Sequence, residues 1–369
     1  MSAAEALRRR IAVEGPITIA AFMADALGLP GLGYYATRDP LGASGDFTTA
    51  PEISQMFGEL LGLWCVDAWM RMGRPAPVRL VEPGPGRGTL MADALRAARV
   101  APDFLAAVRV HLVETSPVLR DRQAQTLTGH AGLAAPPEWH ADLAEVPEGP
   151  TLLLANEFFD ALPIRQFERH PDGWHERRVD VDPATGGFRM AVDPLPSAAA
   201  ALIPEEVRIR APVGGVAEVS PAGRTVARLI GERVARYGGA ALVIDYGHDR
   251  PAPGDTLQAV KGHAYAPVLE APGTADLTAH VCFASLAAAA GEAGAEAHGP
   301  VGQGAFLERL GIRIRADRLR RTGTPAQAAA VDAALSRLVD ADQMGTLFRV
   351  LAITAPGFGI PAGFHDDRA

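Results

Sequence analysis

Apolar residues recur every three to four positions over residues 3–27, a spacing that predicts helix. Gly15-Pro16 interrupts the pattern, so two helices are expected rather than one. Residues 31–52 are dense in Gly, Pro, Ser and Asp, which predicts a loop. Residues 53–73 then show a long helical pattern that ends at Gly73, a residue suited to the left-handed end of a helix.

Strand and helix patterns alternate after residue 77. Short apolar runs rich in Val and Leu predict buried strands, and longer runs with helical spacing follow them. This order predicts a parallel sheet with helices on both faces. The predicted strands are residues 78–84, 108–116, a short one at 138–142, and a run that begins at residue 150 and breaks at Asn156.

The pattern changes again after residue 163. Residues 164–181 alternate between apolar and polar and turn at Pro171-Asp172-Gly173, which predicts an antiparallel hairpin inserted into the sheet order. The alternation of helix and strand then resumes. Its predicted elements are a helix at 218–237, a strand at 238–247, helices at 283–294 and 303–310, and a terminal strand at 346–354.

Together these patterns predict an α/β fold with a Rossmann-like sheet, an N-terminal helical region and an inserted antiparallel and helical subdomain. Five segments are expected: an N-terminal helical cap and lid loop (1–75), the first part of the Rossmann-like domain (76–163), the inserted subdomain (164–237), the remainder of the Rossmann-like domain (238–357) and a C-terminal tail (358–369).

The composition is that of an ordinary globular protein, with 48% hydrophobic and 21% charged residues among 369. The net charge of −8 provides no overall positive field for a phosphate backbone, so no nucleic-acid partner is expected. Cys65 and Cys282 lie far apart, with no C-x-x-C pair and no histidine at ligand spacing. They are interpreted as buried thiols in a reducing compartment, and no metal is expected.

No membrane insertion is expected, because no apolar run approaches the roughly 20 residues that span a bilayer. The N-terminus carries three arginines but lacks the continuous apolar core of a secretory signal. A cytoplasmic protein is the expectation.

The segment Leu80–Leu95, LVEPGPGRGTLMADAL, joins a predicted strand to a predicted helix. Glycines there let the backbone approach a ligand and leave the N–H groups of the helix free to meet it. A P-loop is excluded because no Gly-Lys-Ser/Thr follows. A dinucleotide fold needs G-x-G-x-x-G, whereas a methyltransferase fold has an acid before G-x-G-x-G. Glu82 before Gly84, Gly86 and Gly88 fits the second spacing and disfavours a pyrophosphate.

Two further acids follow the next strands. Glu114 ends strand 108–116, where an acid that holds a ribose is expected. Asp142 follows the short third strand, where its carboxylate could accept a hydrogen bond from the exocyclic amine of an adenine. The alternative is that the glycines only make a tight turn, but two acids placed beside them favour a nucleotide-like cofactor.

The stretch NEFFDALP, residues 156–163, falls at the carboxyl end of the fourth strand, where open α/β sheets place their chemistry. Asn156, Glu157 and Asp160 are hard to explain as core residues. Tyr246 and the loop residue His263 are weaker candidates.

A candidate lid precedes residue 53. Thr48 and Thr49, with Asp46 and Glu52 beside them, could close over a cofactor. The alternative for Thr48, Thr49 and Glu52 is ordinary capping of the helix that follows.

Seven ordered blocks give a further signal: residues 45–62, 80–93, 155–167, 242–247, 272–281, 303–312 and 344–353. Together they resemble the MidA-like S-adenosylmethionine-dependent methyltransferases, and the resemblance runs from about residue 3 to 355. This family includes a mitochondrial protein that methylates an arginine on the 49-kDa subunit of respiratory complex I. One departure is Cys282, where an acid is expected before Phe283.

The resemblance implies a class I methyltransferase-type sheet that binds S-adenosylmethionine and a protein partner whose arginine is methylated, with symmetric dimethylarginine as the product. Because a guanidinium stays protonated, we expect Glu157 to clamp it, Asp160 to act as second acid and Asn156 to orient the clamp. The alternative is a complex I assembly factor that binds the cofactor or a partner without turnover. The expected cofactor residues are Glu82, Gly84, Gly86, Gly88, Glu114, Asp142, Thr48 and Thr49.

Overall fold

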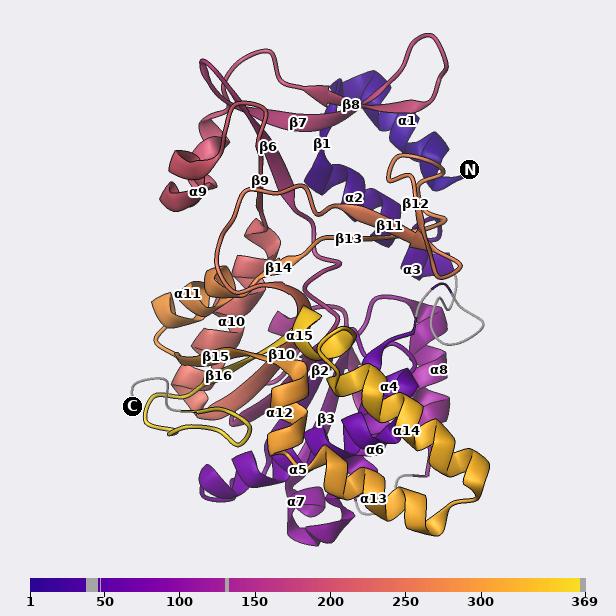
Figure 1. The fold of residues 1–369 in the computed structure, drawn as a ribbon, viewed down its shortest axis with the longest axis vertical. Coiled ribbons are helices and arrows are strands. Elements are labelled where there is room, and N and C mark those ends of the chain that lie inside the picture. The colour runs from indigo at the N-terminus through magenta and orange to yellow at the C-terminus, as the bar shows by residue number, and fades with distance from the viewer. Residues whose placement is uncertain (38–45, 47, 130–132, 366–369) are drawn as a thin grey trace.

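The computed structural model describes residues 1–37, 46, 48–129 and 133–365 (Figure 1). Over these residues its largest sheet contains eight strands. They are β2 (Val78–Pro83), β3 (Val108–Val113), β4 (Glu138–His140), β5 (Thr151–Asn156), β10 (Gly239–His248), β14 (Val281–Cys282), β15 (Glu296–Gly302) and β16 (Phe348–Thr354).

The strand order of this sheet is β15-β16-β10-β5-β2-β3-β4, with β14 paired to β10 off this path. All neighbours from β10 to β4 are parallel, whereas β16 is antiparallel to both β10 and β15. The carboxyl ends of β2, β3, β4 and β5 therefore meet at one edge of the sheet, which is where open α/β sheets bind ligands.

Helices cover both faces because successive side chains of the central strands point in opposite directions. Leu80 and Leu242 pack on one face, and their neighbours Val81 and Val243 pack on the other. The first face is covered by α5 (Gln55–Arg71), α6 (Thr89–Ala97), α7 (Pro102–Ala107), α12 (Gln303–Arg309), α13 (Ile312–Thr322) and α14 (Pro325–Val339), and the second by α10 (Pro221–Tyr237) and α11 (Phe283–Glu292).

A second sheet lies at the other end of the molecule (Figure 1), with order β1-β7-β6-β9 and with β8 paired to β7. Its first strand comes from the N-terminal region, so the first helices and the inserted hairpin share one apolar core. The elements are α1 (Ala3–Glu14), β1 (Ile17–Thr18), α2 (Ile19–Gly28), β6 (Arg165–His170), β7 (Gly173–Val181), β8 (Phe188–Val192), α9 (Glu205–Arg210) and β9 (Val216–Val219).

Short elements complete the fold. A small antiparallel sheet has the order β12-β11-β13 and packs beside α2. The remaining elements are α3 (Tyr34–Thr37), α4 (Ala50–Ile53), α8 (Pro117–Leu127), β11 (Gln258–Lys261), β12 (Ala264–Ala266), β13 (Asp276–Thr278) and α15 (Met344–Leu347). No helix in the described part of the chain is long and apolar enough to cross a membrane.

The predicted α/β class and the hairpin at 164–181 are confirmed. The prediction of an all-parallel sheet is wrong at β16, because an apolar run shows that a strand is buried and carries no information on its direction. The helices at 312–339 were not predicted. Their many Arg and Ala residues obscure two short apolar stripes, Ile312, Ala316 and Leu319 in α13 and Val331, Leu335 and Leu338 in α14. Thr324 and Gln327 form a capping box that marks the start of α14.

Candidate functional site

A cavity of about 480 Å³ opens at the carboxyl ends of β2, β3 and β5. It brings together eight of the predicted site residues, from segments far apart in sequence. Its lining includes Thr49, Glu82, Gly84, Gly86, Glu114, Asp142, Asn156 and Glu157. The other three predicted residues, Thr48, Gly88 and Asp160, do not line it, and neither does His263.

The glycine loop forms the floor of this cavity. Gly84, Gly86 and Gly88 have φ values of 61°, 53° and 80°, which favour glycine. A Cβ on Gly84 would lie 3.0 Å from Cδ2 of Phe158, so a side chain there would crowd the cavity wall. Gly88 is the left-handed N-cap of α6 and shapes the loop without lining the cavity.

Glu82 provides a buried acceptor at the end of β2. Glu82 is only 3% exposed, and burial raises the pKa of its carboxyl well above the usual range. Its Oε2 has no hydrogen-bond partner among the described residues. Because buried polar atoms are normally paired, this oxygen is suited to a ligand that brings a donor or a positive charge.

Glu114 ties the end of β3 to the glycine loop. Its Oε1 accepts from the Ser116 N–H at 2.7 Å and its Oε2 from Nε2 of Gln123 at 3.2 Å. The same Nε2 donates to the Gly86 carbonyl at 2.8 Å. Gln123 was missed in the sequence, because a polar residue inside a helix gives no motif signal. Both Glu114 oxygens retain further acceptor capacity for hydroxyl groups.

Asp142 caps a short 3-10 helix, Leu143–Glu145, by accepting from the Ala144 N–H at 2.8 Å. Asp142 also lines the cavity and is exposed to solvent. The capping contact occupies one oxygen, and the other carboxylate oxygen is left for the adenine contact that the sequence suggests.

Glu157 follows β5 in a left-handed conformation, with φ at 48°, which is strained for a residue other than glycine. Its Oε1 accepts from the Ala50 N–H at 3.0 Å and from Nδ2 of Asn156 at 3.1 Å. Burial raises the pKa of Glu157 to about 7, although both hydrogen bonds lower it. The carboxylate is thus held at the cavity wall by α4 and β5.

The lid prediction falls partly outside the described residues, because residues 38–45 and 47 are not among them. Thr49 is the N-cap of α4 but makes no side-chain capping hydrogen bond, and it lines the cavity. Glu52 accepts from Oγ1 of Thr89 and pairs with Arg87 at 3.6 Å, which joins α4 to the glycine loop.

Behind Glu157 lies a group of acids that the sequence predicted only in part. Asp160 is 6% exposed, with Oδ1 unpaired among the described residues, and the Tyr246 hydroxyl lies against its carboxylate. Asp245 is fully buried, and its Oδ2 accepts from the N–H groups of Phe159 at 3.0 Å and Asp160 at 3.1 Å. Asp245 therefore fixes the turn that carries the predicted acids. Its place near the end of a buried strand was the available signal.

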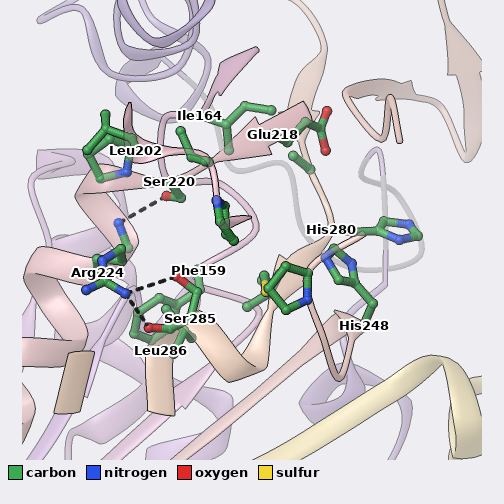
Figure 2. Close-up of a pocket in the computed structure, with 18 of the residues that line it drawn as sticks. Phe159, Ile164, Leu202, Glu218, Ser220, Arg224, His248, His280, Ser285 and Leu286 are labelled. Atoms are coloured by element: carbon green, nitrogen blue, oxygen red, sulfur yellow. Dashed lines mark hydrogen bonds between the residues drawn. The ribbon is translucent and has the colours of Figure 1, made fainter. Parts of the chain in front are cut away.

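A second cavity, of about 550 Å³, lies between β9, α10 and α11 (Figure 2). Thr225 lines both this cavity and the first one, so the two cavities are neighbours. Arg224, which Figure 2 shows at its wall, donates to the Ser285 carbonyl at 3.1 Å and pairs with Glu292 at 3.0 Å. A second arginine at this cavity, Arg228, pairs with Glu232, so both arginines are paired within the protein. No predicted site residue lines this cavity.

Two groups of side chains outside both cavities have the composition of metal ligands. They are His111, Glu138 and His140, and His170, Asp172 and His175. In each group the donor atoms already contact one another: Nδ1 of His111 lies 3.0 Å from Nε2 of His140, and Nε2 of His175 lies 2.9 Å from Oδ1 of Asp172. The chemistry of the first cavity does not involve them.

Several known proteins resemble the chain over most of its length. A family model described as an S-adenosyl-L-methionine-dependent methyltransferase matches residues 60–301. A crystal structure from Burkholderia thailandensis with S-adenosyl-homocysteine bound has a TM-score of 0.81 and 31% identity, covering 95% of this chain and 91% of that one. A second structure from the same organism has a TM-score of 0.84 and 32% identity, covering 98% and 94%.

Curated relatives extend over most of the chain. Protein arginine methyltransferase NDUFAF7, mitochondrial, of Danio rerio is 40% identical, covering 94% of this chain and 85% of the relative. The protein of the same name in Homo sapiens is 41% identical, covering 84% and 73%.

These names contradict the expectation of a cytoplasmic protein, because the relatives are mitochondrial. That expectation was based on the lack of a long apolar run. Such a run indicates a membrane span or a secretory signal and is not a feature of mitochondrial import.

Proposed function

The chain belongs to the family of S-adenosyl-L-methionine-dependent methyltransferases, and we propose that it methylates an arginine of a partner protein. One observation carries the proposal: a single cavity is lined both by the glycine loop with Glu82 and Glu114 and by the strained Glu157. The first set suits a cofactor with a positive charge and ribose hydroxyls. Glu157 suits a positively charged methyl acceptor that lies beside the cofactor.

The residues present fit S-adenosylmethionine. The unpaired buried Oε2 of Glu82 fits its positively charged methionine end. The absence of side chains at Gly84 and Gly86 lets the backbone of the loop come close to the cofactor. We assign Glu114 to the ribose hydroxyls, Asp142 to the adenine amine, and Gly84, Gly86 and Thr49 to the cavity wall. Gly88 acts by starting α6, and Thr48 is assigned to the lid. When bound, the cofactor supplies an electrophilic methyl group.

The protein's part in the reaction is to position the acceptor and shape its charge. A guanidinium is a weak nucleophile because its positive charge is delocalised over three nitrogens. A carboxylate at one edge draws that charge to its side and leaves the far nitrogen richer in electrons. We assign this clamp to Glu157, whose Oε1 is already fixed by Ala50 and Asn156. Asp160 adds negative charge from behind. The nitrogen that gains the methyl group loses one proton, and we assign Glu157, with its pKa raised to about 7, as the group that accepts it.

The finer proposal concerns the partner. The resemblance to the mitochondrial methyltransferase of complex I assembly, and relatives that carry the name of a mitochondrial arginine methyltransferase, support a 49-kDa-type complex I subunit as acceptor. Symmetric dimethylarginine is the product that we propose.

The rate of methyl transfer is expected to rise with pH between about 6 and 8. Only ionised Glu157 can clamp a guanidinium, and burial raises its pKa to about 7. Below that pKa the rate should fall by about tenfold per pH unit. Single-turnover rates between pH 5.5 and 9 measure this, and the Glu157→Gln variant should lose the dependence. A flat profile for the wild type would contradict an ionised clamp.

Calorimetric titration tests the cofactor assignment. The protein should bind S-adenosylmethionine and S-adenosylhomocysteine, and should not bind NADH at the same concentrations. Binding of NADH in place of S-adenosylmethionine would support the dinucleotide interpretation of the glycine loop and refute the proposal.

A further inference from the structure

Four acidic side chains, Glu157 among them, lie close together beside the wall of the first cavity. Glu157 and Asp160 follow β5, Asp245 lies in β10, and Asp276 is the first residue of β13. Asp160 lies close to the other three, and its negative charge raises the pKa of each of them. None of the four forms an ion pair with a cationic side chain in the part of the chain that the structure describes, although Arg337 acts on Glu157 from beyond ion-pair distance.

Buried carboxylates that lie this close together repel one another, so their negative charge must be neutralised by a nearby cation or by bound protons. Asp160 is 6% exposed, and its Oδ1 has no hydrogen-bond partner among the described residues. Asp160 does not line the cavity, so its unpaired oxygen adds negative charge behind the cavity wall and makes no direct contact with a ligand there.

Tyr35 connects this group to the cavity. Its side chain lines the cavity, and its hydroxyl donates to Oδ1 of Asp276 at 2.7 Å. Burial and Asp276 raise the pKa of Tyr35, so the hydroxyl keeps its proton and that proton is committed to Asp276. While that proton is donated to Asp276, the Tyr35 oxygen can only accept from a ligand in the cavity. Burial raises the pKa of Asp276 to about 8, and a guanidinium bound beside Tyr35 would favour the ionised carboxylate that accepts this proton. A guanidinium has five N–H donors and no acceptor, which matches a wall of acceptors.

We infer that Tyr35 and Glu157 together bind the guanidinium group of the acceptor, and that Asp276 is a positioning residue that turns the Tyr35 oxygen into an acceptor. Asp160 supplies negative charge behind both. The inference rests on the proposed arginine methylation and adds the residues that select arginine over lysine, since a guanidinium spreads its donors over a planar fork whereas an ammonium is compact.

The test is a titration of protein saturated with S-adenosylhomocysteine, using N-acetylarginine methylamide and N-acetyllysine methylamide as probes. The wild type should bind the arginine probe at least about tenfold more tightly. A lost hydrogen bond to a charged group is worth about tenfold or more in affinity. Tyr35→Phe and Asp276→Asn should therefore bind the arginine probe about tenfold more weakly, and their preference for arginine over lysine should shrink.

The matched control is Tyr237→Phe, the same chemical change at a residue that lines neither cavity. It should bind both probes like the wild type. Titration with S-adenosylhomocysteine, the first step for every variant, reports both folding and the cofactor site.

Two results would overturn the inference while leaving the proposed function intact: wild-type affinity for the arginine probe in both Tyr35→Phe and Asp276→Asn, or no preference of the wild type for arginine. Failure of the wild type to bind S-adenosylhomocysteine would instead remove the proposed function itself.

Discussion

Replacing Glu157 with glutamine is expected to lower kcat for methyl transfer by about a hundredfold to a thousandfold, the range seen when one preorganised electrostatic group is removed. Glutamine keeps the size of the side chain and can still accept from the Ala50 N–H, so the fold of the turn should survive. It cannot carry the charge that draws the guanidinium to one side. Kinetics at saturating acceptor and cofactor measure the effect.

The matched control is Glu168→Gln, the same substitution on β6 outside both cavities. It should leave kcat unchanged. Affinity for S-adenosylhomocysteine should stay within about twofold in both variants, because neither change touches the acids assigned to the cofactor. A Glu157→Gln enzyme that keeps most of its activity would mean that another group holds the acceptor.

Replacing Glu82 with glutamine is expected to weaken S-adenosylmethionine binding by about ten- to a hundredfold, which corresponds to about 1.5–3 kcal/mol for a hydrogen bond to a charged group. The carboxyl is almost fully buried and has an oxygen without a partner in the described structure. A cationic ligand would supply that partner and favour the ionised form against the raised pKa of Glu82.

Calorimetry on the wild type, Glu82→Gln and Glu168→Gln measures this effect. Affinity of Glu82→Gln equal to that of the wild type would show that the cofactor does not use this carboxylate. In that case the buried acid of β2 would require another explanation.

Most of the residues that we assign to the cofactor could be predicted from the sequence to lie at one edge of the sheet. Glu82, the three glycines and Glu114 lie at fixed offsets from predicted strand ends, and the parallel order of β2, β3 and β5 brings such ends together. The assignment of Gly88 needed the structure, because spacing cannot distinguish a glycine that lines a cavity from one that starts a helix.

The residues that we assign to the acceptor were less predictable. Tyr35 and Asp276 are 241 positions apart, and they meet because the small sheet of β11 to β13 packs beside α2. Neither belongs to a local motif, so only tertiary structure reveals the contact. Asp245 did have a sequence signal, its place near the end of a buried strand. Its hydrogen bonds to the N–H groups of Phe159 and Asp160 could not be predicted, because they depend on the pairing of β10 with β5.

Transfer of a labelled methyl group tests the central claim most directly. The protein would be incubated with methyl-labelled S-adenosylmethionine and the 49-kDa-type complex I subunit encoded by the same genome, followed by mass spectrometry of the subunit. We predict label on an arginine, present with the wild type and nearly absent with Glu157→Gln. A wild-type protein that binds S-adenosylmethionine but leaves every arginine of the subunit unlabelled, or labels another residue type, would contradict the account.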